Sequence, residues 1–174
     1  LTEVYGYKRD RRVIWTGFGA LGFASLMAWT VVNLPASDSA FMGEYQGNLE
    51  AVFGNTWRIA GGSMLAFWCG SFVNAYVMAR MKVWMRGRLL WTRTIGSTVA
   101  GELVDSGMFY FIAFYGIWET GDIVKVAFAQ YVLKTLWEVV MTPVTYRIVA
   151  FLKTAEQEDY YDTDTDFTPF SVKV

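Results

Sequence analysis

Residues 90–118 read LWTRTIGSTVAGELVDSGMFYFIAFYGIW, and this stretch decides the fold of the chain. It is apolar and long enough to cross a bilayer, whose hydrocarbon core of about 30 Å needs about 20 helical residues. Glu102 and Asp105 nevertheless lie near its middle, where insertion of each lipid-facing carboxylate costs roughly 2.5–3.5 kcal/mol. Two acids three residues apart share one side of a helix, so we expect that side to face protein or a watery cavity. The stretch therefore predicts a membrane helix that forms one wall of a polar site.

The composition of the whole chain indicates a membrane protein. Hydrophobic residues make up 54% of the 174 residues and aromatic residues 18%. The apolar runs reach about 20 residues, whereas a soluble domain has shorter runs separated by turns. We therefore expect an all-α integral membrane protein. The formal net charge of −1 says little, because the charges are strongly segregated along the chain.

Four apolar segments predict membrane-spanning helices, at about 13–34, 57–79, 90–116 and 123–152. Lysine and arginine cluster before the first and third of these helices, at 8–12 and 80–93. The positive-inside rule places both clusters in the cytoplasm and the acidic loop 36–56 outside. Residues 49–53 within that loop could form a short helix on the membrane surface. The topology that follows has both ends of the chain in the cytoplasm.

The domain organisation follows from these segments. We expect a transmembrane bundle over 1–152, with further N-terminal helices in a longer reading frame because the chain starts at Leu1. An acidic cytoplasmic tail follows over 153–174 and contains EQEDYYDTDTDFTPF at 156–170. The tail is interpreted as a solvated terminus, and the alternative is a gating or docking contact with the basic connection at 80–93.

Small residues recur every four positions in the first two spans: Ala20, Ala24 and Ala28, then Gly62, Ala66, Gly70 and Asn74. In the first span this spacing predicts close packing against another helix, or else a docking face for another subunit. In the second span it predicts a groove of small residues that leads to the amide of Asn74. That amide either joins two helices or contacts a ligand.

Polar residues also recur at helical spacing in the last two spans: Thr94, Thr98, Glu102 and Asp105, then Gln130, Lys134 and Glu138. Lys134 and Glu138 can pair within the fourth span, which we expect to be tilted or bent at Pro143. The pair is either a salt bridge that stabilises the bundle or part of a polar site shared with Glu102 and Asp105. One lysine cannot neutralise three buried acids. Either a carboxyl group is protonated, or Arg93 or a ligand supplies the missing partner.

Several kinds of chemistry are excluded by the residue types. The single cysteine, Cys69, allows no intrachain disulfide, and the lack of histidine removes imidazole catalysis. The sequence has no glycine-rich phosphate loop, nucleophile elbow or metal-ligand spacing, so we expect neither an enzyme nor a cofactor. Glu102 and Asp105 do not suit an aspartyl hydrolase, because acids at i and i+3 do not face each other across a substrate. The basic segments are short connectors and do not indicate nucleic-acid binding.

Binding and movement of a solute is the class of function that remains. Aromatic residues border the polar set: Phe67, Trp68, Phe109, Tyr110, Tyr131 and Trp137. Rings of this kind stack on the faces of a flat polar heterocycle, while carboxylates and amides bind the donors and acceptors at its edge. The lipid bilayer is the other expected partner.

Four segments resemble the queuosine precursor transporter family, also called vitamin uptake transporters. They are LTEVYGYKRDRRVIW at 1–15, FVNAYVMARMKVWMRGRLLWTRTIGSTVAGELVDS at 72–106, LKTLWEVVMTPVTYRIVAFLK at 133–153 and YDTDTDFTPF at 161–170. The strings are long and unusual, and they occur in the order found in the family. Members of the family have about six spans, and the two expected before LTEVYG are missing from this sequence.

The resemblance implies a carrier in the bacterial inner membrane that imports 7-cyano-7-deazaguanine (preQ0) or a related deazapurine. It also implies a fold similar to the substrate-binding subunits of energy-coupling-factor importers, with an energy-coupling module or a second copy as a possible partner. Glu102 or Glu138 would bind the donor edge of the heterocycle. The other expected contacts are Asn74, Asp105, Gln130, Lys134, Phe67, Trp68 and Trp137, with Arg93 and Arg80 nearer the cytoplasmic mouth. The alternatives are a carrier of another vitamin-like heterocycle and a non-transporting membrane subunit whose buried polar residues are structural.

Overall fold

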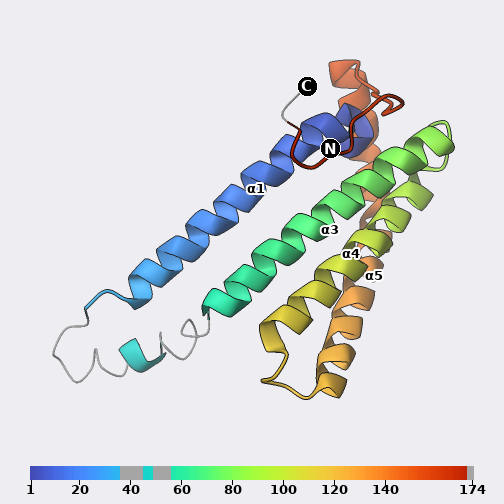
Figure 1. Ribbon diagram of the computed structural model, residues 1–174. Helices are drawn as coiled ribbons and strands as arrows, with labels where there is room; N and C mark the ends of the chain where they lie inside the picture. The colour runs from blue at the N-terminus through green and yellow to red at the C-terminus, as the bar shows by residue number, and fades with distance from the viewer. Residues whose placement is uncertain (36–44, 49–55, 172–174) are drawn as a thin grey trace.

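The computed structural model describes residues 1–35, 45–48 and 56–171, and within these residues the fold is all-α with no strand. Four long helices follow one another: α1 (Thr2–Val32), α3 (Thr56–Trp84), α4 (Leu90–Phe114) and α5 (Thr120–Glu156). Figure 1 shows α3 between α1 and the pair formed by α4 and α5. The expected all-α class is confirmed. The surface helix predicted at 49–53 lies outside the described residues.

The predicted helix bounds agree with the structure to within five residues, except at the N-terminus. α1 begins at Thr2, well before the predicted start at 13, because the basic segment at 8–12 continues the helix. The helix is interrupted at Gly6, whose φ of 78° is accessible to glycine at little cost. α5 continues through Pro143 and ends at Glu156. The bend predicted at this proline stays a prediction.

The close crossing of α3 and α4 depends on two glycines. A Cβ atom on Gly70 would lie 2.8 Å from the Cβ of Asp105 and 3.0 Å from the carbonyl oxygen of Gly101. A Cβ atom on Gly101 would lie 2.7 Å from the Cβ of Asn74 and 2.9 Å from the carbonyl oxygen of Gly70. Ala66, one turn before Gly70, is fully buried. The groove of small residues predicted on the second span is confirmed as the contact with α4.

The packing of α1 differs from the prediction. Ala20 and Ala24 are exposed, so these two residues of the predicted stripe make no close contact with another helix of the described residues. The alternative, a docking face for another subunit, stays a prediction. A Cβ atom on Gly17 would instead lie 3.0 Å from Phe67, and one on Gly22 would lie 3.4 Å from Met64. The glycines allow α3 side chains to approach the α1 backbone.

The acidic C-terminal segment packs against the rest of the chain, so its interpretation as a solvated terminus is wrong. Figure 1 shows the red segment crossing the N-terminal end of α1. Both oxygens of the buried Asp162 carboxylate accept hydrogen bonds from the Tyr7 backbone N–H, at 3.2 and 3.0 Å. The Tyr7 hydroxyl donates to the Phe167 carbonyl oxygen at 2.9 Å, and burial raises the pKa of this phenol to about 12. The alternative prediction was a contact between this segment and the basic connection at 80–93. One such pair is present, because Lys82 binds Asp159.

The glycine crossing can be tested by the same substitution at two sites of α4. Gly101→Ala forces the two helices apart, and we expect a loss of about 1–3 kcal/mol in the free energy of unfolding. Gly107→Ala should be neutral or stabilising by about 0.5–1 kcal/mol, because nothing lies within 4 Å of its added Cβ and alanine favours helix. Denaturant unfolding in detergent measures both changes. Equal stability of the two variants would contradict the crossing.

Candidate functional site

A cavity of about 400 Å³ opens between α3, α4 and α5. Asn74 reaches it from α3, Thr98 and Glu102 from α4, and the rest of its lining comes from α5: Leu133, Lys134, Trp137 and Glu138. Five of the residues predicted for the binding site line this one cavity: Asn74, Glu102, Lys134, Trp137 and Glu138. The glycine crossing brings Asn74 of α3 and Glu102 of α4 together, since Asn74 contacts Gly101, the residue before Glu102.

Lys134 joins α5 to α4 beside the cavity. Its Nζ lies 2.7 Å from Glu102 Oε2 and 2.7 Å from Asp105 Oδ2. The sequence suggested a pair between Lys134 and Glu138 within α5, and the structure replaces it with this contact between helices. The physical reason is that two carboxylates three residues apart present two acceptors to one ammonium group.

The charges around the cavity are not balanced. Glu102, Asp105 and Glu138 supply three carboxylates and Lys134 one ammonium group. Among the residues that the structure describes, no cation lies within salt-bridge distance of Glu138. This carboxylate and the exposed ring of Trp137 are therefore available to a ligand with N–H donors at the edge of a flat ring.

Four residues predicted for the site lie away from the cavity lining. Phe67 and Trp68 pack against the hydrophobic cluster between α1 and α3, where Trp68 contacts Trp15 and Phe72. Gln130 is exposed on α5, one turn before Lys134. Arg93 is buried and bound to Glu3. Helical spacing identified a polar face on each helix, but it did not reveal which aromatic residues lie beside that face.

Thr98 and Leu133 line the cavity but were not among the predicted site residues. The spacing of Thr98 from Glu102 was a usable signal, since both lie on the polar stripe of α4. Leu133 carried no signal in the sequence, because an apolar residue in a membrane span is ordinarily a lipid or core contact.

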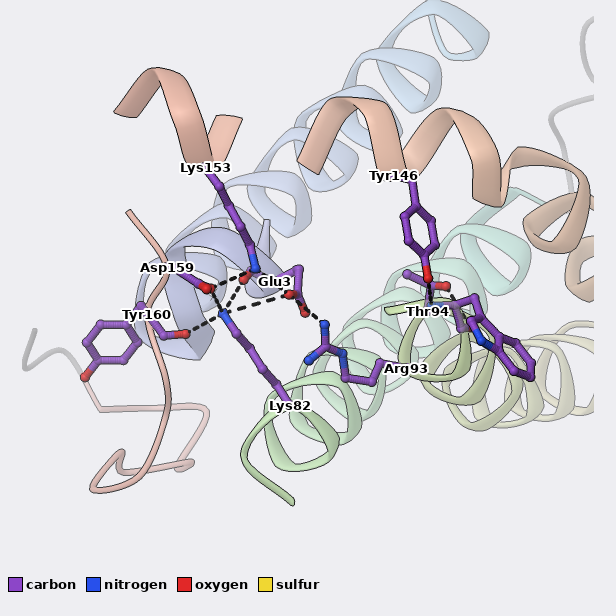
Figure 2. Close-up of polar contacts among 9 residues, drawn as sticks. Glu3, Lys82, Arg93, Thr94, Tyr146, Lys153, Asp159 and Tyr160 are labelled. Atoms are coloured by element: carbon purple, nitrogen blue, oxygen red, sulfur yellow. Dashed lines mark hydrogen bonds and ion pairs between the residues drawn. The ribbon is translucent and has the colours of Figure 1, made fainter. Parts of the chain in front are cut away.

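A second polar cluster joins the helix ends near the N-terminus, as Figure 2 shows. The nearly buried Glu3 carboxylate is 2.9 Å from Arg93 Nη2 of α4 and 2.9 Å from Lys153 Nζ of α5. Lys82 of α3 is 3.9 Å from the same carboxylate and also binds Asp159. Lys153 lies 2.8 Å from Asp159. We call Glu3, Lys82, Arg93, Lys153 and Asp159 the ion cluster.

Burial and pairing act in opposite directions on the groups of the ion cluster. Burial lowers the pKa of Lys82 despite its acidic neighbours. Burial would also lower the pKa of Lys153, but hydrogen bonds to Asp159 and Glu3 raise it. For Asp159, burial raises the pKa and the hydrogen bonds from Lys153 and Lys82 outweigh it, so the pKa lies below the ordinary value of 3.8. Lys153 and Asp159 are therefore charged at neutral pH.

The depressed pKa of Asp159 predicts a loss of stability in acid. The stabilising effect of its carboxylate is complete above the ordinary pKa of 3.8 and disappears as the pH falls through the lower pKa of the folded protein. Thermal unfolding between pH 7 and pH 3 should therefore show a smaller decline for Asp159→Asn than for the unchanged chain. Parallel curves for the two proteins would contradict the pairing.

Comparison with known proteins identifies the family. The family model described as "Putative vitamin uptake transporter" matches residues 1–148. The chain belongs to the vitamin uptake transporter family. This is a family of transporters and not of enzymes, and its members are membrane proteins. By length and composition, α1 is the one helix of the described residues that could cross a membrane by itself.

Two curated relatives of this chain carry more specific names. The "Probable queuosine precursor transporter" of Bacillus subtilis (strain 168) is 31% identical over 148 residues, which cover 84% of this chain and 63% of the relative. The "Queuosine precursor transporter" of Escherichia coli (strain K12) is 26% identical over 146 residues, covering 79% of this chain and 60% of the relative. The chain thus spans less than two thirds of the length of these relatives. No solved structure matches it.

The contact between α4 and α5 can be tested at Lys134. Lys134→Met leaves the carboxylates of Glu102 and Asp105 without their cation, and we expect the free energy of unfolding to fall by about 1–3 kcal/mol. Lys125→Met is the matched control, because Lys125 forms an exposed pair with Asp122 near the start of the same helix. The control should change stability by less than about 0.5 kcal/mol. Equal effects in denaturant unfolding would disprove the role of Lys134.

Proposed function

We propose that this chain imports a deazapurine precursor of queuosine, such as 7-cyano-7-deazaguanine, across the bacterial cytoplasmic membrane. The observation that carries the proposal is the cavity of about 400 Å³, lined by an amide, two carboxylates, an ammonium group and an indole ring. The names of the two relatives support the choice of solute. A cavity of this size holds a bicyclic heterocycle together with some water.

The chemistry of the cavity suits the edge of a guanine-like ring. Such an edge presents adjacent N–H donors, which the two oxygens of one carboxylate accept together. Glu138 is the first candidate for this contact, because no cation of the described chain pairs with it. Asn74 and Lys134 supply donors for ring nitrogen and carbonyl acceptors, and the exposed ring of Trp137 can stack on the heterocycle.

We propose that α1, α3, α4 and α5 all span the membrane, with both chain ends in the cytoplasm. Each of the last three helices carries charged residues that reduce its hydropathy. Within a bundle those residues need not face lipid, because Lys134 binds Glu102 and Asp105 and Arg93 binds Glu3. The similarity to energy-coupling-factor subunits, and an energy-coupling module or a second copy as partner, belong to the same proposal.

Direct binding tests the solute and the site together. We expect saturable binding of 7-cyano-7-deazaguanine to the purified protein, and Glu138→Gln should weaken it by about tenfold to hundredfold, because the amide offers one acceptor in place of two. Lys125→Met, which alters a charge far from the cavity, should bind normally. If the solute and its aminomethyl analogue both fail to bind a folded protein, the assignment of the solute is wrong.

A second candidate is a non-transporting membrane subunit whose polar residues are structural. The observation that favours it is the pairing of Lys134 with Glu102 and Asp105, which joins two helices without any ligand. Glu102→Gln separates the two functions. If Glu102 is structural, the variant protein loses stability with no change in binding. If Glu102 contacts the solute, the variant protein loses affinity for the solute and remains folded. Competition by other vitamin-like heterocycles tests the remaining alternative.

A further inference from the structure

The segment 157–171, which we call the strap, has no helix or strand and crosses the ends of the helices. Its backbone is held at several points. The Tyr160 N–H donates to the Val4 carbonyl oxygen at 3.0 Å, and Arg11 donates to the carbonyl oxygens of Asp166 and Thr168 at 3.2 and 2.8 Å. The Trp15 indole N–H donates to the Pro169 carbonyl oxygen at 2.9 Å. The rings of Phe167 and Phe170 also pack on aromatic side chains of α1 and α3, so the strap is held by polar and aromatic contacts together.

The ion cluster connects the strap to all four long helices. Glu3 belongs to α1, and the groups around its carboxylate come from α3 (Lys82), α4 (Arg93) and α5 (Lys153). Asp159 brings the strap into the same cluster through Lys82 and Lys153. Figure 2 shows these side chains converging on Glu3 and Asp159. One small set of charges thus fixes the relative positions of four helix ends.

Two of these helices also form the cavity. Arg93 precedes Glu102 by nine residues on α4, a rise of about 13 Å along a helix. Lys153 lies on α5, which also carries Lys134 and Glu138. A change at the ion cluster that moves the end of either helix therefore moves one wall of the cavity, since a helix transmits displacement along its axis.

The ion cluster is incompletely bonded in this arrangement. Nε and Nη1 of the buried Arg93 and Oε2 of Glu3 have no hydrogen-bond partner among the described residues. The Asp159 carboxylate is 43% exposed, so water can compete for it. Unsatisfied buried groups favour an alternative arrangement in which they find partners, and ion pairs exchange partners more readily than a packed apolar core does.

We propose that the strap closes the cytoplasmic end of the bundle, and that the ion cluster is a lock which opens when solute passes from the cavity to the cytoplasm. The proposal rests on the proposed transport function. It assigns a conformational role to the acidic segment, in which release of Asp159 from Lys82 and Lys153 loosens the hold of the strap on the ends of α3 and α5.

A reversible cross-link tests the lock. Arg9 and Glu158 form an exposed pair between α1 and the strap, so cysteines there can be joined by a short bismaleimide with a reducible spacer. The experiment uses the otherwise unchanged protein with Cys69→Ala, in liposomes with radiolabelled 7-cyano-7-deazaguanine. Cross-linked protein should bind the solute normally and import it at least about tenfold more slowly, and reduction should restore import. The same linker between cysteines at Asp122 and Lys125, near the start of α5, should leave import unchanged.

Equal import by the cross-linked and reduced proteins would overturn the lock while leaving the transport function intact. Absence of binding in every variant would instead overturn the transport function, and the lock with it. Hydrogen exchange gives a second measurement, on the Tyr160 and Tyr7 backbone amides that hold the strap. Asp159→Asn should accelerate their exchange about tenfold or more, whereas Glu158→Gln, which alters an exposed pair, should not. Unchanged exchange in Asp159→Asn would also overturn the lock.

Discussion

The close approach of the α3 and α4 backbones at Gly70 and Gly101 is the contact on which the arrangement of the cavity depends. A side chain on either glycine would collide with the carbonyl oxygen of the other. This contact sets Asn74 and Asp105 against the crossing point, and Glu102 follows Gly101 directly. The polar groups of the cavity therefore hold their positions because two residues without side chains allow the helices to meet.

Charge is the second constraint, and it acts at two levels of the bundle. In the cavity, Lys134 of α5 binds two carboxylates of α4 and leaves Glu138 without a cation in the described chain. At the helix ends, Glu3 collects cations from three helices. Both sets of ion pairs connect helices, which is where buried charges find partners in a protein that spans a membrane. In the function that we propose, the first set leaves an acceptor for a solute, and the second is a contact that opens.

The polar residues that line the cavity could be selected from the sequence because a helix repeats every 3.6 residues. That period placed Lys134 and Glu138 on one side of α5, and Glu102 on the polar side of α4. The partner of Lys134 could not be predicted, because the choice between Glu138 and the α4 carboxylates depends on how α4 and α5 pack. Phe67 and Trp68 were wrongly assigned to the site, because the sequence does not show how α3 packs against its neighbours. Aromatic residues occur on every side of α3, and periodicity does not show which side faces α4.

The sequence by itself determined the helices, their order, the small-residue groove on α3 and the family, since these depend on local spacing and on strings of neighbouring residues. Only the tertiary structure decided where the acidic C-terminal segment lies. Asp159 and Asp162 look like residues of a solvated tail, yet they bind Lys82 and the Tyr7 N–H, which are distant in the chain. The sequence does not show whether an aspartate is solvated or buried. Its role depends on the hydrogen-bond donors that folding brings beside its carboxylate.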